Sequence, residues 1–209
     1  MTPHRSTDPG WADYRESIGD RSGLFAALRS AFAPGTALYP GSYLDLSPST
    51  AIPSVTYVDV DARAAQFFAD EARVKAELEG RTAPGVHPDV RFLHADYTKP
   101  LSLPEQGFDL LISLYATAVW DSCRRYLRPG GLLLANASHG DASLAALDRG
   151  AELVSAVHAR DGRYRLDRER LARYLVPKDA ARADAALIRE SGRGVGYTVP
   201  AFAYVFRVR

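Results

Sequence analysis

Short runs of apolar or β-branched residues recur along this chain and predict a parallel sheet that is buried on both faces. Continuous rather than alternating runs of this kind are typical of parallel strands covered by helices on each side. The continuous runs are Leu110 to Ile112 and Leu132 to Leu134, and further short strands are predicted over Ala37 to Tyr39, Val55 to Val58 and Val90 to Ala95.

Between these runs, apolar residues recur at helical spacing. Residues 22–33 predict an amphipathic helix that feeds the first strand, and the apolar positions from Ala64 to Leu78 predict another helical face. Asp61 is well placed to cap the start of that second helix, and Gly80 to stop it. The first crossover, between Gly41 and Val55, holds two prolines, so we expect one or two helical turns there at most.

The pattern changes in the last third of the chain. Leu153 to Val157 predicts an edge strand, and Asp161-Gly162 predicts a hairpin turn that leads to Tyr164 to Leu166. Helices are expected over 168–175 and 180–190. Alternating apolar residues from Phe202 to Val208 predict a final strand, so the whole pattern indicates an α/β, Rossmann-like doubly wound sheet.

Composition narrows the class of protein. At 209 residues with 46% hydrophobic content, residues 11–209 are expected to form one domain, whereas 1–10 hold two prolines without periodicity and predict a mobile arm. A formal net charge of +1 favours a small or neutral partner over nucleic acid or membrane. The single Cys123 suits a reducing compartment and no apolar run has membrane-spanning length, so a cytoplasmic protein is expected.

Two acids stand where predicted strands end. Asp59 closes the second strand, and ligands of a doubly wound sheet lie outside the carboxyl ends of its strands, where such an acid can hold a ribose diol. The alternative role of Asp59 is a helix cap, but Asp61 can serve as that cap, which favours the ribose role. Asp96 follows the third strand and has the same ambiguity, because Asp before Tyr97 and Thr98 also starts turns.

In this order, the segments Thr36 to Asp61, Val90 to Asp96, Phe108 to Ser113 and Leu127 to Asn136 resemble the class I S-adenosylmethionine-dependent methyltransferases. The resemblance covers roughly residues 20 to 150. It implies about seven strands, mostly parallel with an antiparallel last strand, and S-adenosylmethionine as cofactor.

The same resemblance implies a cofactor-binding set. Asp59 would hold the ribose, Asp96 the adenine amino group, and the phenol of Tyr39 the amino group of the methionine moiety. The remaining members are Gly41, Ser42, Tyr43, Tyr97 and Ser113. Of the family's G-x-G-x-G loop, Gly41 alone remains, with Ser42 and Tyr43 in place of small residues.

A polar cluster follows the fifth predicted strand and supplies the catalytic candidates. Methyl transfer needs an acceptor that loses its proton, and His139 oriented by Asp141 would meet that need, with Asn136 and Ser138 lining the same pocket. The alternative is that His139-Gly140 forms a turn and Asp141 caps the next helix. No metal site is expected, because no carboxylate pair accompanies these residues.

These residues indicate a methyltransferase that acts on a small molecule. The alternative is a catalytically inactive, methyltransferase-like binding or regulatory protein, because the loop after the first strand keeps only one glycine of the family's pattern. A nicotinamide-dependent enzyme is disfavoured by the missing G-x-G-x-x-G and by the terminal strand.

Overall fold

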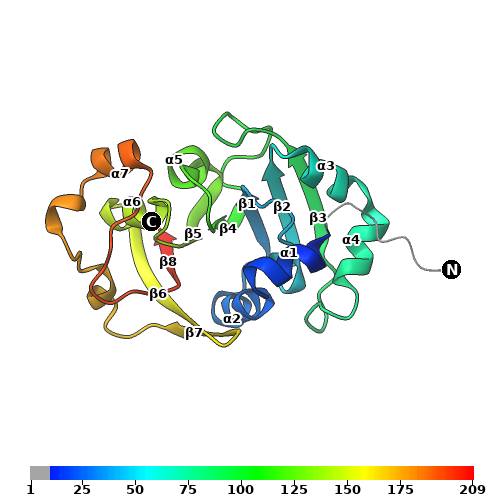
Figure 1. Cartoon of the computed structure of the whole chain (residues 1–209), viewed down its shortest axis with the longest axis horizontal. Helices are drawn as coiled ribbons and strands as arrows, with labels where there is room; N and C mark the ends of the chain where they lie inside the picture. Colours follow the sequence, from blue (N-terminus) through cyan, green and yellow to red (C-terminus); the bar gives the residue numbers. More distant parts are fainter. Residues whose placement is uncertain (1–9) are drawn as a thin grey trace.

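The computed structural model describes residues Gly10 to Arg209, which fold around one twisted sheet of eight strands (Figure 1). From edge to edge the order is β3-β2-β1-β4-β5-β8-β6-β7. The strands are β1 (Thr36–Pro40), β2 (Ser54–Asp59), β3 (Asp89–His94), β4 (Phe108–Ser113), β5 (Leu127–Ala135), β6 (Ala151–Arg160), β7 (Arg163–Asp167) and β8 (Ala203–Val208). The first five run parallel, and β8 lies antiparallel between β5 and β6. The doubly wound α/β sheet with an antiparallel last strand is thereby confirmed.

The hairpin of β6 and β7 accounts for the eighth strand. Its turn at Asp161-Gly162 is as predicted, with φ of 50° at Asp161 and 70° at Gly162; aspartate tolerates this left-handed region and glycine adopts it with little strain. The prediction of an edge strand over Leu153 to Val157 was wrong, because β7 is the edge and β6 pairs on both sides.

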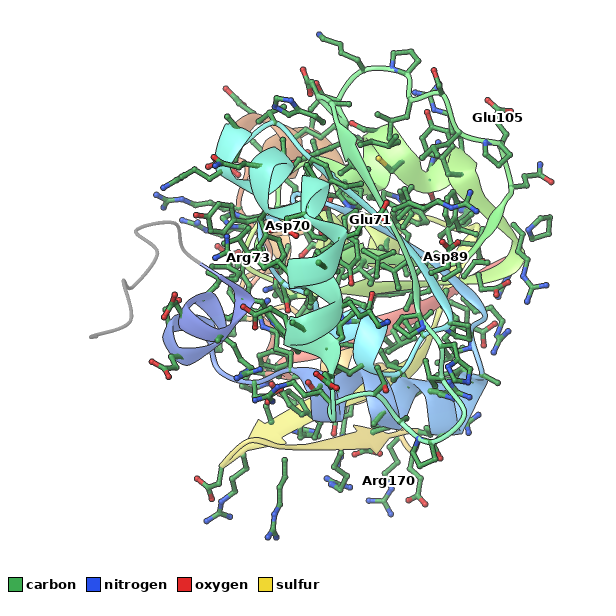
Figure 2. All side chains as sticks on the ribbon, turned by 90° about the vertical axis from the view of Figure 1, so that its right-hand side faces the viewer. Asp70, Glu71, Arg73, Asp89, Glu105 and Arg170 are labelled. Atoms are coloured by element: carbon green, nitrogen blue, oxygen red, sulfur yellow. The ribbon has the colours of Figure 1, made fainter. Side chains whose placement is uncertain are left out.

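One face of the sheet is covered by α1 (Trp11–Ile18), α2 (Ser22–Phe32), the 3-10 turn η1 (Ser47–Thr50), α3 (Ala62–Ala69) and α4 (Glu71–Leu78). The short first crossover is confirmed by η1. The helical face predicted from Ala64 to Leu78 is divided in two at Asp70, whose side chain accepts a hydrogen bond from the N–H of Arg73 at 3.0 Å and caps α4. Figure 2 shows this junction, with Asp70, Glu71 and Arg73 labelled.

The other face carries α5 (Val119–Cys123), η2 (Arg124–Tyr126), α6 (Asp141–Leu147), η3 (Leu171–Leu175), η4 (Ala180–Arg182) and α7 (Ala185–Ser191). The helices expected over 168–175 and 180–190 are therefore shorter than predicted, and much of their length is 3-10 turn. Two apolar cores result, one on each side of the sheet. Between Gly10 and Arg209, no helix combines the length and apolar character that crossing a membrane requires.

Candidate functional site

The carboxyl ends of β1 to β5 share one edge of the sheet, and the predicted site residues lie in the loops that leave this edge. The strand order reverses between the neighbours β1 and β4. From β1 the chain continues to β2 and β3 on one side, and from β4 it continues to β5 on the other side. In open α/β sheets, such a switch point is where ligands bind.

Asp59 is fixed at the end of β2 by two main-chain amides. Its Oδ2 accepts from the N–H of Tyr43 at 2.7 Å, and its Oδ1 accepts from the N–H of Asp61 at 2.9 Å. Asp61 in turn accepts from the N–H of Arg63 at 2.8 Å, so the predicted cap of α3 is confirmed. Each carboxylate oxygen can accept more than one hydrogen bond, so half-buried Asp59 can still accept from a ligand.

Val60 is an exposed apolar residue that the sequence pattern did not single out. Its side chain is 62% exposed directly after Asp59, and its carbonyl lies 3.0 Å from Nε2 of His94 on the neighbouring strand. An exposed apolar side chain between two acid-bearing strand ends offers a contact for one face of a planar ring. A valine after an aspartate shows nothing of this in the sequence, because exposure depends on the loops around it.

The loop after β3 contains Asp96, whose Oδ1 accepts from both the N–H and the hydroxyl of Thr98 at 2.9 and 2.6 Å. These bonds lower the pKa of Asp96, and they form the turn that was the alternative role for this residue. The next residue, Tyr97, donates its hydroxyl to the carbonyl of Thr117 at 3.0 Å and so joins the loops after β3 and β4.

Gly41 lies where the loops after β1 and β4 meet. Its φ is +66°, and a Cβ there would come within 2.8 Å of the Cβ of Ala116. The N–H of Gly41 donates to the carbonyl of Val58 at 2.8 Å. Gly41 thus permits a close contact between loops, and its own amide is not available to a ligand.

Two predicted cofactor contacts point elsewhere in the structure. Tyr39 is fully buried and donates its hydroxyl to Asp45 at 3.2 Å, and burial raises the pKa of this phenol well above its usual range. Ser113 is also buried and donates to Oδ2 of Asp141 at 2.6 Å. Both side chains therefore stabilise the protein's interior, because a strand residue whose side chain faces a packed layer cannot also face the ligand edge.

Asp141 does not have either role that was predicted for it. Gly140 precedes α6 as its cap residue, and the carboxylate of Asp141 instead accepts from the N–H groups of Val119 and Trp120 at 3.1 and 3.0 Å. It therefore caps α5 and contacts Ser113 rather than orienting His139. Burial raises the pKa of Asp141, with the hydrogen bonds acting in the opposite direction.

His139 is half-buried, and its ring makes no hydrogen bond to any residue from Gly10 to Arg209. Asn136 is 5% exposed; its Oδ1 accepts from exposed Ser138 at 2.7 Å, whereas its Nδ2 is enclosed without a partner. Ser42, after β1, is 1% exposed and its hydroxyl is likewise unpartnered. Buried polar atoms without partners are rare in folded proteins, so these two atoms mark positions where a ligand or water is expected.

The sequence also gave no sign of a buried ion pair above the loop that follows β1. Arg21 donates from Nη1 to Oδ2 of Asp45 at 3.1 Å, and Oδ1 of Asp45 accepts from the N–H of Ser47 at 3.0 Å. The ring of Tyr115, 53% exposed, lies 5.1 Å from the guanidinium carbon of Arg21. Arg21 and Asp45 are 24 residues apart, and no local pattern joins them.

Three non-glycine residues at this edge have positive φ: Tyr43 at 44°, Tyr115 at 63° and Ala118 at 58°. Such conformations cost of order 1 kcal/mol each and cluster at functional sites. Their presence in the loops after β1 and β4 indicates that these loops are held in shape against local preference.

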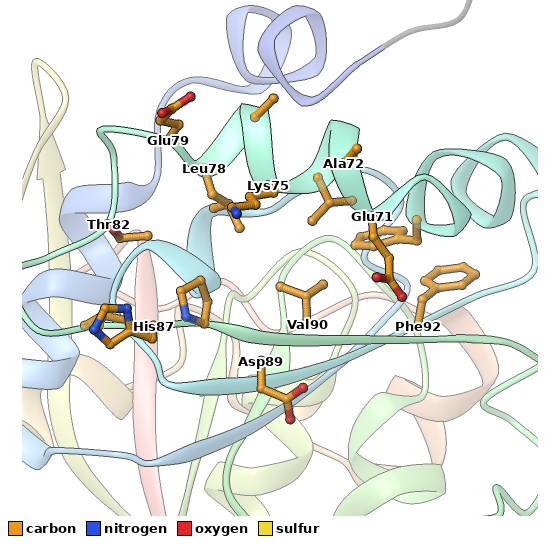
Figure 3. Close-up of a pocket in the computed structure, with 15 residues that line it drawn as sticks. Glu71, Ala72, Lys75, Leu78, Glu79, Thr82, His87, Asp89, Val90 and Phe92 are labelled. Atoms are coloured by element: carbon orange, nitrogen blue, oxygen red, sulfur yellow. The ribbon is translucent and has the colours of Figure 1, made fainter.

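A separate groove of about 840 Å³ lies between α4 and the edge strand β3 (Figure 3). Its walls are largely apolar, with Val90 and Phe92 below and Leu78 above. It contains none of the predicted site residues. No three potential metal-ligating side chains gather anywhere in the described part of the chain.

No protein-family model matches the sequence, and no curated protein matches it. Among solved structures, PH0226 protein from Pyrococcus horikoshii OT3 overlaps 98% of this chain and 93% of its own length at 15% identity, with a TM-score of 0.49. A putative O-methyltransferase from Klebsiella pneumoniae overlaps 91% and 80% at 12% identity, with a TM-score of 0.48. A SAM-dependent methyltransferase from Methanosarcina mazei overlaps 83% and 92% at 16% identity, with a TM-score of 0.43.

Proposed function

We propose that this chain binds S-adenosylmethionine at the carboxyl edge of its sheet and transfers the methyl group to a small molecule. The observation that carries this proposal is the strand order. The order reverses between β1 and β4. On the β2 side of that reversal, Asp59 ends β2, Val60 follows it, and Asp96 lies in the loop after β3.

The residues at this edge fit the parts of such a cofactor. Asp59 is held rigidly and keeps lone pairs for the two ribose hydroxyls, and exposed Val60 offers an apolar face to the adenine. We assign the adenine amino group to the second oxygen of Asp96, since its first oxygen binds Thr98. The unpartnered hydroxyl of Ser42 lies in the loop that would meet the methionine end.

When bound, the cofactor supplies a methyl group on a positively charged sulfur, and the chain must position an acceptor and remove its proton. His139 is available as the general base, because its ring has no protein partner among the described residues. The enclosed Nδ2 of Asn136 is a donor that can hold an acceptor's oxygen. Asp141 is assigned no part in proton transfer, since its carboxylate is fully engaged with β4 and α5.

One observation favours the alternative of a binding or regulatory protein without catalysis. The loop after β1 is crowded, because Ala116 packs against Gly41 and the amides of Gly41 and Tyr43 already have acceptors. A site closed in this way could hold S-adenosylhomocysteine without releasing it for turnover.

Calorimetric titration with S-adenosylmethionine, S-adenosylhomocysteine and the nicotinamide dinucleotides tests the proposal. A ligand at a hundred times its dissociation constant stabilises the fold by about 2.7 kcal/mol, which corresponds to a rise in Tm of about 5–10 °C for a chain of this size. Heat and a Tm rise with the adenosyl ligands alone are expected. Binding without transfer to any small-molecule acceptor would favour the inactive alternative, and a response to the nicotinamide dinucleotides alone would overturn the proposal.

A further inference from the structure

Arg21 has more hydrogen-bond donors than the protein satisfies. It is 5% exposed, yet the one side-chain hydrogen bond it makes within the described residues runs from Nη1 to Asp45. A guanidinium carries five N–H donors and cannot lose its charge at ordinary pH. Nε and Nη2 thus remain without a protein acceptor among the described residues and are free to donate to an acceptor supplied from outside.

These donors face an opening rather than the closed interior. Neither Nε nor Nη2 is among the fully enclosed unpartnered atoms of the described chain. The ring of Tyr14 lies 5.0 Å from that of Tyr43, whose amide binds Asp59. Asp45 in the loop after β1 and Tyr115 in the loop after β4 both contact Arg21, which places its guanidinium at the switch point of the sheet, beside the loop whose Tyr43 amide binds Asp59.

The main chain of that loop offers little to an anion. Pro40 has no N–H, and the amides of Gly41, Tyr43 and Asp45 donate to Val58, Asp59 and Ser42. Main-chain N–H groups that point together into one concavity are the usual alternative to a cationic side chain for binding an anion. Here most of them are directed back into the protein.

We propose that Arg21 binds the carboxylate of the methionine moiety of S-adenosylmethionine, in place of main-chain donors, most of which this loop directs back into the protein. The inference rests on the proposed function. A planar guanidinium matches a carboxylate with two parallel hydrogen bonds. Asp45 holds Arg21 in position through Nη1, and Asp45 is itself fixed by Tyr39 and by the amide of Ser47.

The test compares two ligands that differ by this carboxylate. S-adenosylhomocysteine has it, and S-adenosyl-3-thiopropylamine, its decarboxylated form, does not. In calorimetric titration the unmodified protein is expected to bind S-adenosylhomocysteine about 10- to 100-fold more tightly than the decarboxylated ligand. Arg21→Lys, which keeps the charge but not the planar fork, should remove most of that preference and leave affinity for the decarboxylated ligand unchanged.

A second variant removes the charge of Arg21 without leaving the buried carboxylate of Asp45 unpaired. Since Arg21→Gln alone would leave a buried carboxylate unpaired, the double variant Arg21→Gln with Asp45→Asn removes both charges, and its thermal unfolding checks that it folds. The matched control is Arg29→Gln within α2, the helix that Arg21 precedes; the Arg29 guanidinium donates to the carbonyl of Ala51 at 2.6 Å. It should keep the full preference.

The outcomes separate the two proposals. Loss of the preference in both Arg21 variants, with the Arg29 control unchanged, would support the inference. A preference that persists in the Arg21 variants would overturn it and leave Arg21 a structural partner of Asp45, with the proposed function intact. If the unmodified protein binds neither ligand, both proposals fail together.

Discussion

Asp59 is held by the amides of Tyr43 and Asp61, so its carboxylate is oriented before any ligand arrives. Replacing it should therefore affect binding and stability together. We expect Asp59→Ala to weaken S-adenosylhomocysteine binding by about 1–3 kcal/mol, the cost of leaving ribose hydroxyls without acceptors in a closed site, as measured by titration calorimetry. The variant should also lose stability, because the amide of Tyr43 loses its acceptor.

Asp61→Ala is the matched control for this substitution. It removes the cap of α3 and should cost about 1 kcal/mol of unfolding free energy without changing ligand affinity. Equal losses of affinity in the two variants would mean that the ribose contact lies elsewhere and that both aspartates serve only the helix start.

His139 is the residue to which the proposed chemistry assigns proton removal. If it acts as the general base, His139→Ala should lower turnover by about a hundredfold or more, while the affinity for S-adenosylhomocysteine stays nearly constant. Turnover is measured as methyl transfer to whichever acceptor the unmodified protein uses. His139→Gln, which keeps a hydrogen-bonding side chain but no titratable group, should be as impaired as His139→Ala, and full activity in either variant would contradict the role.

At the scale of single residues, position along the strands was readable from the sequence, but side-chain partners were not. Asp59 and Asp61 were assigned correctly as strand end and helix cap because both roles depend on neighbouring residues. Asp141 was misassigned because its partners Ser113 and Val119 lie 28 and 22 residues earlier. Arg21 was missed for the same reason, since Asp45 is brought to it only by the packing of α2 on the sheet.

Among the elements, β4, α5 and α6 are linked by hydrogen bonds to one buried carboxylate, that of Asp141. Burial raises the pKa of Asp141 in the folded state, so the folded protein holds this proton more tightly than the unfolded chain does. The contribution of Asp141 to stability is therefore largest when the group is protonated, and it falls as the pH rises from about 4, the usual range of an aspartate, through the raised folded pKa.

Asp141→Asn isolates this effect. The amide has no titrating proton, so the variant should lack the part of the decline in stability above about pH 4 that the carboxylate causes. Urea unfolding of both proteins across pH 4 to 8 measures it as the difference in their unfolding free energies. A difference that does not change with pH would show that ionisation of Asp141 is not linked to folding.

Element types were predicted better than element ends. The helical face from Ala64 to Leu78 was correct, but the break at Asp70 was not visible, because an aspartate suits both a helix surface and a helix cap. The strand over Leu153 to Val157 was correct in type and wrong in place. Whether a strand lies at an edge depends on which later segment pairs with it, and here β7 and β8 pair with it on either side.

For the molecule as a whole, β8 is the strand that joins the parallel part of the sheet to the β6–β7 hairpin. It joins β5 to β6, and its Tyr204, Val205 and Phe206 are buried in the two cores. Ending the chain after residue 201 should abolish cooperative unfolding in urea, followed by far-ultraviolet circular dichroism, because β5 and β6 would both become open edges and lose these buried contacts.

A chain that ends after Val208 is the control, since it lacks only exposed Arg209 and keeps the whole of β8. It should unfold like the longer chain. A peptide of residues 202–209 added to the shortened chain should restore part of the cooperative transition, and a sharp transition in the shortened chain without the peptide would contradict the dependence on β8.

The place of β8 in chain order also has a consequence during synthesis. A ribosome adds roughly 5–20 residues per second, so β1 to β5 emerge seconds before the strand that must lie against β5. Throughout that interval the nascent chain presents an unpaired edge at β5 beside the completed parallel layer. We expect such a chain to bind chaperones until residue 208 has left the exit tunnel, and slower translation of the codons for residues 185–208 to lengthen that exposure.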